Sequence, residues 1–580
     1  MQDLNSSLEL RSSNSDSRIH SHDSVESPRR LPSAREVSAE AKNLSDMGYP
    51  LEEAQETREI LEQELSSAHG LPASRRAILH SAVKILDEVL KSFPSASVNI
   101  PVDARAPASS ASTHEPSFEF FYMMLEEAEK GTLWPDHVSN PCLRDMTYAL
   151  IARNENEQLL CHYRVCVYTK AISVISRWLL STETNTSIRS TLIESKSRYI
   201  TAACRALDSI GFLSPPSLSL IQALLSGAML MQEMGNVSQS WALTSVAARY
   251  LVALNGHKLA NRPPQNERDR KLKVCLGWCF CLDTIMSMLL ARRPSLPKLM
   301  TTSAELVVLP EIILGGGLMK TMVDLSLLIQ AANETVTSTE VSQAIDLEGR
   351  YNVISEELKS MLAKIDSARH EASRAHRLDW IAVGFTARAA LISIYQSRLK
   401  FTRKASTRMD CVACARESLG YFSRLQSELS DDTGLAETFT FQAWITPVFP
   451  LSSFLILFCN FIATSYIEDY ALMEQVFQKL HILPNSKSRA RIHHLIDSYL
   501  QLCQEILPSS IESHQRLQTE YVIPRSENHE PSNLQALDQV EWFERPEEHL
   551  SFDGVWGDES LQELLTAHSS LVLFEQDNKI

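Results

Sequence analysis

Two pairs of side chains have residue types that can hold a metal ion. Asp431 and Asp432 are adjacent carboxylates of the kind that bind Mg²⁺, but the further acid that would complete such a site is missing nearby. Cys411 and Cys414 form a C-x-x-C pair, and a structural zinc site needs a second pair that this stretch lacks. The sequence also has no P-loop and no G-x-S-x-G turn. We therefore predict no catalytic set, no metal site and no cofactor.

Asp283 is a carboxylate at the edge of an apolar helical stripe. From Glu267 to Pro297 the apolar residues recur at steps of three and four, which predicts one amphipathic helix. Its last turn would hold two arginines, and the proline after them would end it. A half-buried carboxylate needs a partner, so we expect Arg270 or Arg293 to pair with Asp283. Such a pair favours a structural role for Asp283 over a catalytic one.

The composition indicates an all-α protein. The chain has 580 residues, 44% of them hydrophobic, and only 17 glycines, which is few for the many turns of a β-sandwich. Long amphipathic patterns without strand hairpins or a fixed repeat predict a large, irregular, multi-helix domain. The net charge of −16 argues against a broad nucleic-acid-binding surface.

Changes in composition predict four segments. The first is rich in serine and charge and should be disordered, and the second combines short helices with a Pro/Ala/Ser linker. The third is the helical domain, and the fourth is an acidic tail. The predicted boundaries are 1–50, 51–116, 117–507 and 508–580.

Cysteine usage and hydropathy bear on the environment of the chain. The 11 cysteines are scattered through apolar helical patterns, which predicts buried free thiols rather than a disulfide framework. The apolar run from Val448 to Ala463 is short for a membrane span and contains Pro450 and Asn460, so we expect a core helix. No signal peptide opens the sequence. We predict no membrane partner.

The tail mixes acidic residues with large apolar ones. Such a composition keeps a segment solvated while its apolar side chains remain available to a partner groove, as in an activation segment. The other interpretation, in which Trp542 and Trp556 pack back on the protein, stays open. The apolar residues concerned are Trp542, Phe543, Phe552, Trp556, Leu561, Leu564 and Leu565.

An ordered series of motifs runs through the helical domain and includes Trp241, Arg268, Arg270, Trp278, Asp283, Arg293 and Pro294. This series resembles the signature of the middle homology region of fungal binuclear zinc-cluster transcription regulators. The resemblance covers roughly residues 117–500 and is best from Leu220 to Leu296. Arg292 departs from the pattern, which has glycine there.

The resemblance implies a nuclear regulator of metabolic or secondary-metabolite genes whose helical domain is regulatory. Its partners would be the transcription machinery or other regulators. In that family DNA is bound by an N-terminal six-cysteine zinc module, whereas no cysteine occurs here before Cys142. We expect DNA contact to be missing from this chain or supplied by a partner. A homodimer is possible through Leu51–Leu65, which is short for a coiled coil.

Two other classes of protein remain as alternatives. One is an all-α, metal-dependent, prenyl-using enzyme with Asp431 and Asp432 at its pocket, which would need further carboxylates facing that pair. The other is a helical scaffold that binds only proteins.

Overall fold

A computed structural model confirms the all-α prediction. It describes residues 58, 60–63, 65, 71–91, 118–129, 136–179, 186–211, 214–234, 236–290, 292–308, 316–337, 344–372, 374–402, 404–429, 451–480 and 487–507. Within these ranges the chain forms helices and no strand. The predicted segments 1–50 and 508–580, the linker 92–117 and the Asp431-Asp432 pair lie outside the described residues.

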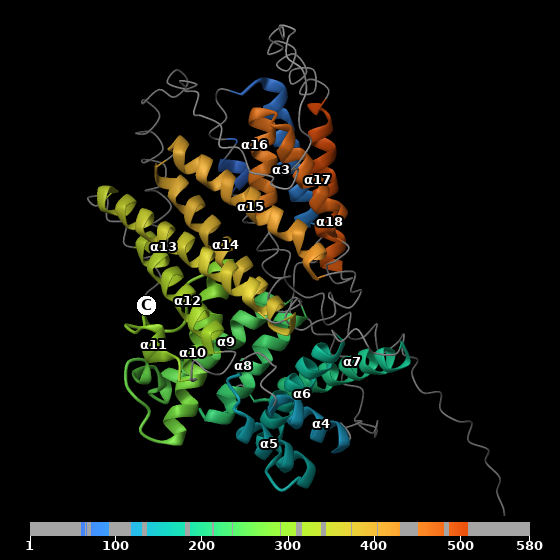
Figure 1. Cartoon of the computed structure of the whole chain (residues 1–580), viewed down its shortest axis with the longest axis vertical. Coiled ribbons are helices and arrows are strands. Elements are labelled where there is room, and N and C mark those ends of the chain that lie inside the picture. The colour runs from blue at the N-terminus through green and yellow to red at the C-terminus, as the bar shows by residue number, and fades with distance from the viewer. Residues whose placement is uncertain are drawn as a thin grey trace, which may run out of the picture.

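The first part of the structure is a layered set of helices around α8 and α10 (Figure 1). The helix α8 is buried along almost its whole length, because its side chains meet neighbouring helices on every side. These helices are α4 (Phe118–Glu129), α5 (Asn140–Ala152), α6 (Glu157–Leu179), α7 (Thr186–Asp208), α8 (Leu218–Glu233), α9 (Val237–Ala253), the 3-10 turn η2 (Gly256–Leu259), α10 (Glu267–Leu289), α11 (Ser303–Leu306) and α12 (Gly316–Thr337).

The second part is a bundle that includes a helix from near the start of the chain. Arg75 of α3 donates to the carbonyls of Ile462 and Ala463 at the end of α16, and Tyr499 of α18 donates to the carbonyl of Ala82. The helices are α3 (Ala73–Lys91), α13 (Ala344–Glu371), α14 (Arg374–Thr402), α15 (Ala405–Leu429), α16 (Leu451–Thr464), α17 (Ile467–Gln478) and α18 (Lys487–Gln504).

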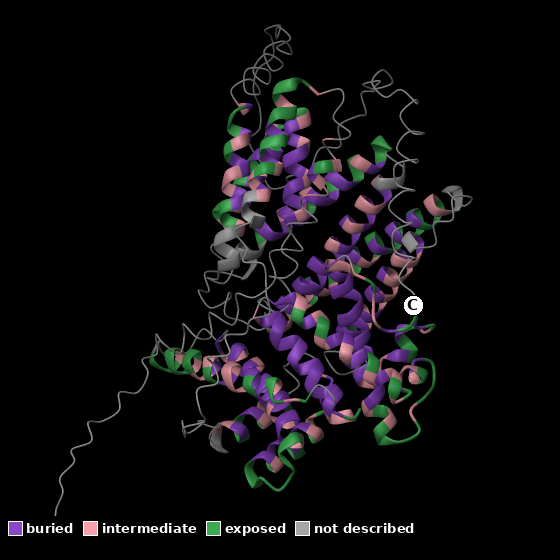
Figure 2. Ribbon diagram, turned by 180° about the vertical axis from the view of Figure 1, so that it is seen from behind, coloured by how far each residue is buried: buried purple, intermediate pink, exposed green. Residues whose placement is uncertain are grey.

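One hydrophobic core runs through both parts, and α14 links them. Near the start of α14, Asp379 is 1% exposed and lies 3.9 Å from Arg177 of α6. The buried residues follow the helix interiors through both parts (Figure 2). Both parts of the structure therefore share one packed hydrophobic interior.

Two helices are long and apolar enough to cross a membrane by length and composition. They are Glu267–Leu289 and His376–Leu399, and 83% of the apolar window in each is buried inside the protein. The run around Leu451–Thr464 is a helix whose apolar side chains are mostly buried, as predicted. Burial of this extent is typical of core helices, whose apolar side chains pack against other parts of the protein.

Candidate regulatory site

The helix α10 ends earlier than its sequence pattern predicted. Asn266 caps its start by accepting from the amide of Asp269, and its last residue is Leu289. The amide of Arg292 then folds back to the carbonyl of Ser287 at 2.8 Å. The prediction that Arg292 and Arg293 form the last helical turn was therefore wrong, because the chain has already turned away from the helix at these residues.

Asp283 anchors this returning chain. Its carboxylate accepts from the amide of Ser295 at 2.7 and 3.0 Å and from the amide of Leu296 at 2.7 Å. The residue is only 1% exposed. Burial raises the pKa of Asp283, and the hydrogen bonds from Leu296 and Ser295 oppose that rise. The expected arginine partner was wrong, since backbone amides supply the hydrogens that a buried carboxylate requires.

Trp241 and Arg292 complete the contact between α9 and this loop. The indole nitrogen of Trp241 donates to the hydroxyl of Ser287 at 3.0 Å, and the Arg292 guanidinium lies 4.5 Å from the centre of the Trp241 ring. The hydroxyl of Ser295 donates to that of Ser245 on α9 at 2.7 Å. We call this set the signature cluster, with the members Trp241, Ser245, Asp283, Ser287, Arg292 and Ser295.

The structure divides the residues of the predicted signature. Trp278 is 1% exposed, and its ring lies edge-on to His137, with the ring centroids 6.3 Å apart. Arg268 and Arg293 are exposed, and Arg270, also exposed, lies 3.7 Å from Glu267. Pro294 is half-buried in the returning loop. Arg292, which departs from the family pattern, is the arginine that contacts a signature tryptophan.

A second buried polar cluster surrounds Asp136 and His137, in the segment before α5. Asp136 lies 2.9 Å from the Lys170 ammonium of α6 and 2.9 Å from Nδ1 of His137. Burial alone would raise the pKa of Asp136, but Lys170 and His137 outweigh it and hold that pKa far below its usual range. This cluster was not predicted from the sequence. The spacing to Lys170 gave no signal, because it spans two elements.

His137 also joins this segment to α8 without forming a catalytic triad. Its Nε2 lies 3.0 Å from the hydroxyl of Ser226 and 3.0 Å from the carbonyl oxygen of Gln222. A carbonyl oxygen only accepts, so Nε2 carries a hydrogen and cannot take a proton from Ser226. His137 and Ser226 are 3% and 2% exposed, and the contacts of His137 are to groups of the protein itself. The cluster is therefore structural.

Comparison with known proteins identifies this part of the chain. Residues 171–313 match the family described as the fungal specific transcription factor domain. These residues are therefore similar to a fungal specific transcription factor domain. The domain begins within α6 and continues past α11, so it includes the whole signature cluster. The resemblance predicted from the motifs is confirmed.

A curated relative of this chain is a named regulator. The thiamine repressible genes regulatory protein thi1 of Schizosaccharomyces pombe is 30% identical to this chain over 100 residues. The aligned part covers 17% of this chain and 13% of thi1, so the chain matches only a small part of that relative's length.

Among the described residues, no group of three or more His, Cys, Asp or Glu side chains is placed to hold a metal ion. Cys411 and Cys414 are 2% and 5% exposed within α15, as expected of core residues. All 11 cysteines are free, and all but Cys142 are buried, which confirms the prediction of buried thiols. Burial raises the pKa of the Cys281 thiol to about 12.

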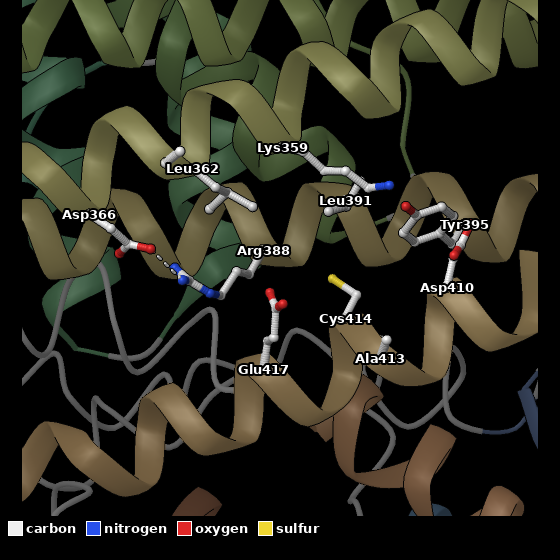
Figure 3. A pocket seen from close by; sticks show the side chains of 11 residues that line it. Lys359, Leu362, Asp366, Arg388, Leu391, Tyr395, Asp410, Ala413, Cys414 and Glu417 are labelled. Atoms are coloured by element: carbon white, nitrogen blue, oxygen red, sulfur yellow. Dashed lines mark hydrogen bonds and ion pairs between the residues drawn. The ribbon is translucent and has the colours of Figure 1, made fainter. Parts of the chain in front are cut away.

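A cavity of about 480 Å³ opens between α13, α14 and α15, also outside the matched domain. Its floor includes Leu391 and Tyr395 of α14, and charged side chains stand around it (Figure 3). The volume is in the range of small-molecule sites. Sequence reasoning missed this cavity, because its walls come from three helices.

Proposed function

We propose that this protein is a fungal transcription regulator whose helical body is regulatory and whose DNA contact comes from a zinc-cluster module or a partner protein. The observation that carries the proposal is the match of residues 171–313 to the fungal specific transcription factor domain. The name of thi1 as a regulatory protein supports the same function.

The signature cluster supports a regulatory rather than a catalytic role for the domain. Its polar atoms are engaged with one another, and the Asp283 carboxylate accepts from the backbone amides of Ser295 and Leu296. An enzyme needs polar groups directed at a space that a substrate can enter. We infer that the cluster fixes the returning loop, and that the protein is not an enzyme.

We further propose that residues 508–580 form an activation segment that contacts the transcription machinery in the nucleus. The support is the alternation of acids with Trp542, Phe543, Phe552 and Trp556. Metabolic or secondary-metabolite genes are the proposed targets, by resemblance to the family.

The test is a reporter assay with the full chain fused to a heterologous DNA-binding domain. We expect reporter expression above background, its loss when residues 508–580 are removed, and activity of that segment when it is fused alone. A variant with Trp542, Phe543 and Trp556 changed to alanine should lose most of the activation at equal protein level. A full-chain fusion that leaves the reporter unchanged would contradict the proposal.

DNA binding is tested separately with the purified chain. We expect no sequence-specific mobility shift by residues 1–580 alone at physiological salt. A specific shift that survives such salt would show that this chain reads DNA itself.

A further inference from the structure

The cavity between α13, α14 and α15 has an apolar floor and charged walls. Leu362, Leu391 and the buried thiol Cys414 contribute apolar surface. Lys359 of α13 and Arg388 of α14 stand on one side, and Asp410 and Glu417 of α15 stand on the other (Figure 3). The cavity therefore places cations and carboxylates around a shared apolar surface.

The cations of α13 and α14 do not form ion pairs with the carboxylates of α15 that face them in the described structure. Arg388 pairs with Asp366 at 3.0 Å, and Lys359 pairs with Glu356 at 2.9 Å. Within the described part of the chain, Asp410 and Glu417 form neither an ion pair nor a hydrogen bond, and both are exposed. Two carboxylates thus remain available at the wall formed by α15.

Two buried polar groups also face the cavity from its other side. Tyr395 is 1% exposed, and the Lys359 ammonium is the polar group beside its hydroxyl. Burial raises the pKa of Tyr395, and the nearby Lys359 ammonium opposes the rise. Nε of the buried Arg388 has no hydrogen-bond acceptor in the described structure. Buried donors without acceptors are costly, so an anionic ligand atom would be stabilised beside them.

Lys359, Arg388, Cys414 and Glu417 line the same cavity (Figure 3). Burial raises the pKa of Cys414, and Glu417 adds to the rise, whereas Arg388 and Lys359 oppose it. Arg369 of α13 lies 4.0 Å from Asp366, and its guanidinium lies over the ring of Tyr421. The hydrogen-bond donors Lys359 of α13 and Arg388 of α14 therefore lie on one side of the cavity, and the carboxylates of α15 lie on the other, with the Cys414 thiol between them.

We propose that this cavity binds a zwitterionic α-amino acid with an aliphatic side chain. The ligand ammonium would contact Asp410 or Glu417, and the ligand carboxylate would accept from Lys359, Tyr395 or Arg388. The aliphatic side chain would cover Leu362, Leu391 and Cys414. The inference concerns binding alone, so it stands or falls separately from the transcriptional role.

Calorimetric titration of the full chain with three probes tests the need for both charges. The probes are L-leucine, 3-methylbutylamine, which lacks the carboxylate, and 4-methylpentanoate, which lacks the ammonium. We expect L-leucine to bind at least about tenfold more tightly than either analogue, because a charge-assisted hydrogen bond is lost in each. No binding of L-leucine at millimolar concentration, or binding of one analogue as tight as that of L-leucine, would overturn the proposal.

Variants of the α15 wall assign the ammonium contact. The double variant Asp410→Asn/Glu417→Gln should weaken L-leucine binding at least about tenfold and leave 4-methylpentanoate binding unchanged. Asp145→Asn, an exposed change on α5, is the matched control and should bind L-leucine as the unchanged protein does. Thermal unfolding without ligand reports whether each variant is folded. Unchanged L-leucine binding by a folded double variant would overturn the assignment.

Discussion

The signature cluster and the cavity between α13 and α15 use polar side chains in opposite ways. Asp283, fully buried, receives three hydrogen bonds from two backbone amides, and Trp241 is engaged by both Ser287 and Arg292. Asp410 and Glu417 stand at an open cavity and pair with no described group. The difference separates polar groups that hold the fold from polar groups that are free to bind a ligand.

The polar groups around Asp136 also hold the fold, and a change at Asp136 should have the largest effect on stability. Asp136→Asn leaves the Lys170 ammonium, 8% exposed, without its carboxylate. Loss of one member of a buried ion pair costs about 3–5 kcal/mol of unfolding free energy, which urea titration measures. Glu129→Gln, which removes a pair with Arg144 at the surface, is the control and should change stability by less than about 1 kcal/mol.

The loss of stability caused by Asp136→Asn should become smaller at low pH. The lowered pKa of Asp136 gives stability that is complete above the unfolded pKa of about 4 and is lost as the pH falls towards the folded pKa. The difference between the unchanged protein and Asp136→Asn should therefore be constant from pH 7 to pH 5 and shrink below about pH 4. A difference that grows on acidification would contradict the ion-pair interpretation.

Asp283→Ala should destabilise the protein by about 2–3 kcal/mol, because the amides of Ser295 and Leu296 lose their acceptor. The pKa of Asp283 is raised, so its contribution is complete below the unfolded pKa and is lost as the pH rises through the folded pKa. The stability difference should hence widen on acidification, opposite to that of Asp136→Asn. Stability equal to that of the unchanged protein would show that the amides find other partners.

Arg292→Ala should have a smaller effect, about 1 kcal/mol, because a half-buried cation over an aromatic ring contributes an energy of that order. Thermal unfolding measures it, and Trp241 fluorescence should change with the loss of the stacked guanidinium. Arg293→Ala is the matched control, since Arg293 is exposed, and should be nearly neutral. Equal effects of the two variants would remove Arg292 from the signature cluster.

Glu417→Gln should leave the unfolding free energy within about 0.5 kcal/mol of the unchanged protein, because Glu417 is exposed and makes no bond in the described structure. Urea unfolding without ligand measures this. A large loss of stability would mean that Glu417 holds the fold, and the contrast between the two regions would fail.

The sequence by itself determined the helical class, the burial of the cysteines, the core helix at Leu451–Thr464 and the resemblance that the family match over residues 171–313 supports. These features depend on periodicity and on local motifs, which a linear pattern records directly. The sequence also identified Asp283 as a carboxylate that needs a partner, although it predicted only half-burial.

Only the tertiary structure decided what that partner is. The Arg292 and Asp283 contacts depend on a loop that folds back after Leu289, and the family pattern had marked Arg292 as a mere departure. Lys170 reaches Asp136 across 34 positions, and the cavity collects side chains from three helices. Such contacts are set by how helices pack against one another, and helical spacing within a single segment carries no record of that packing.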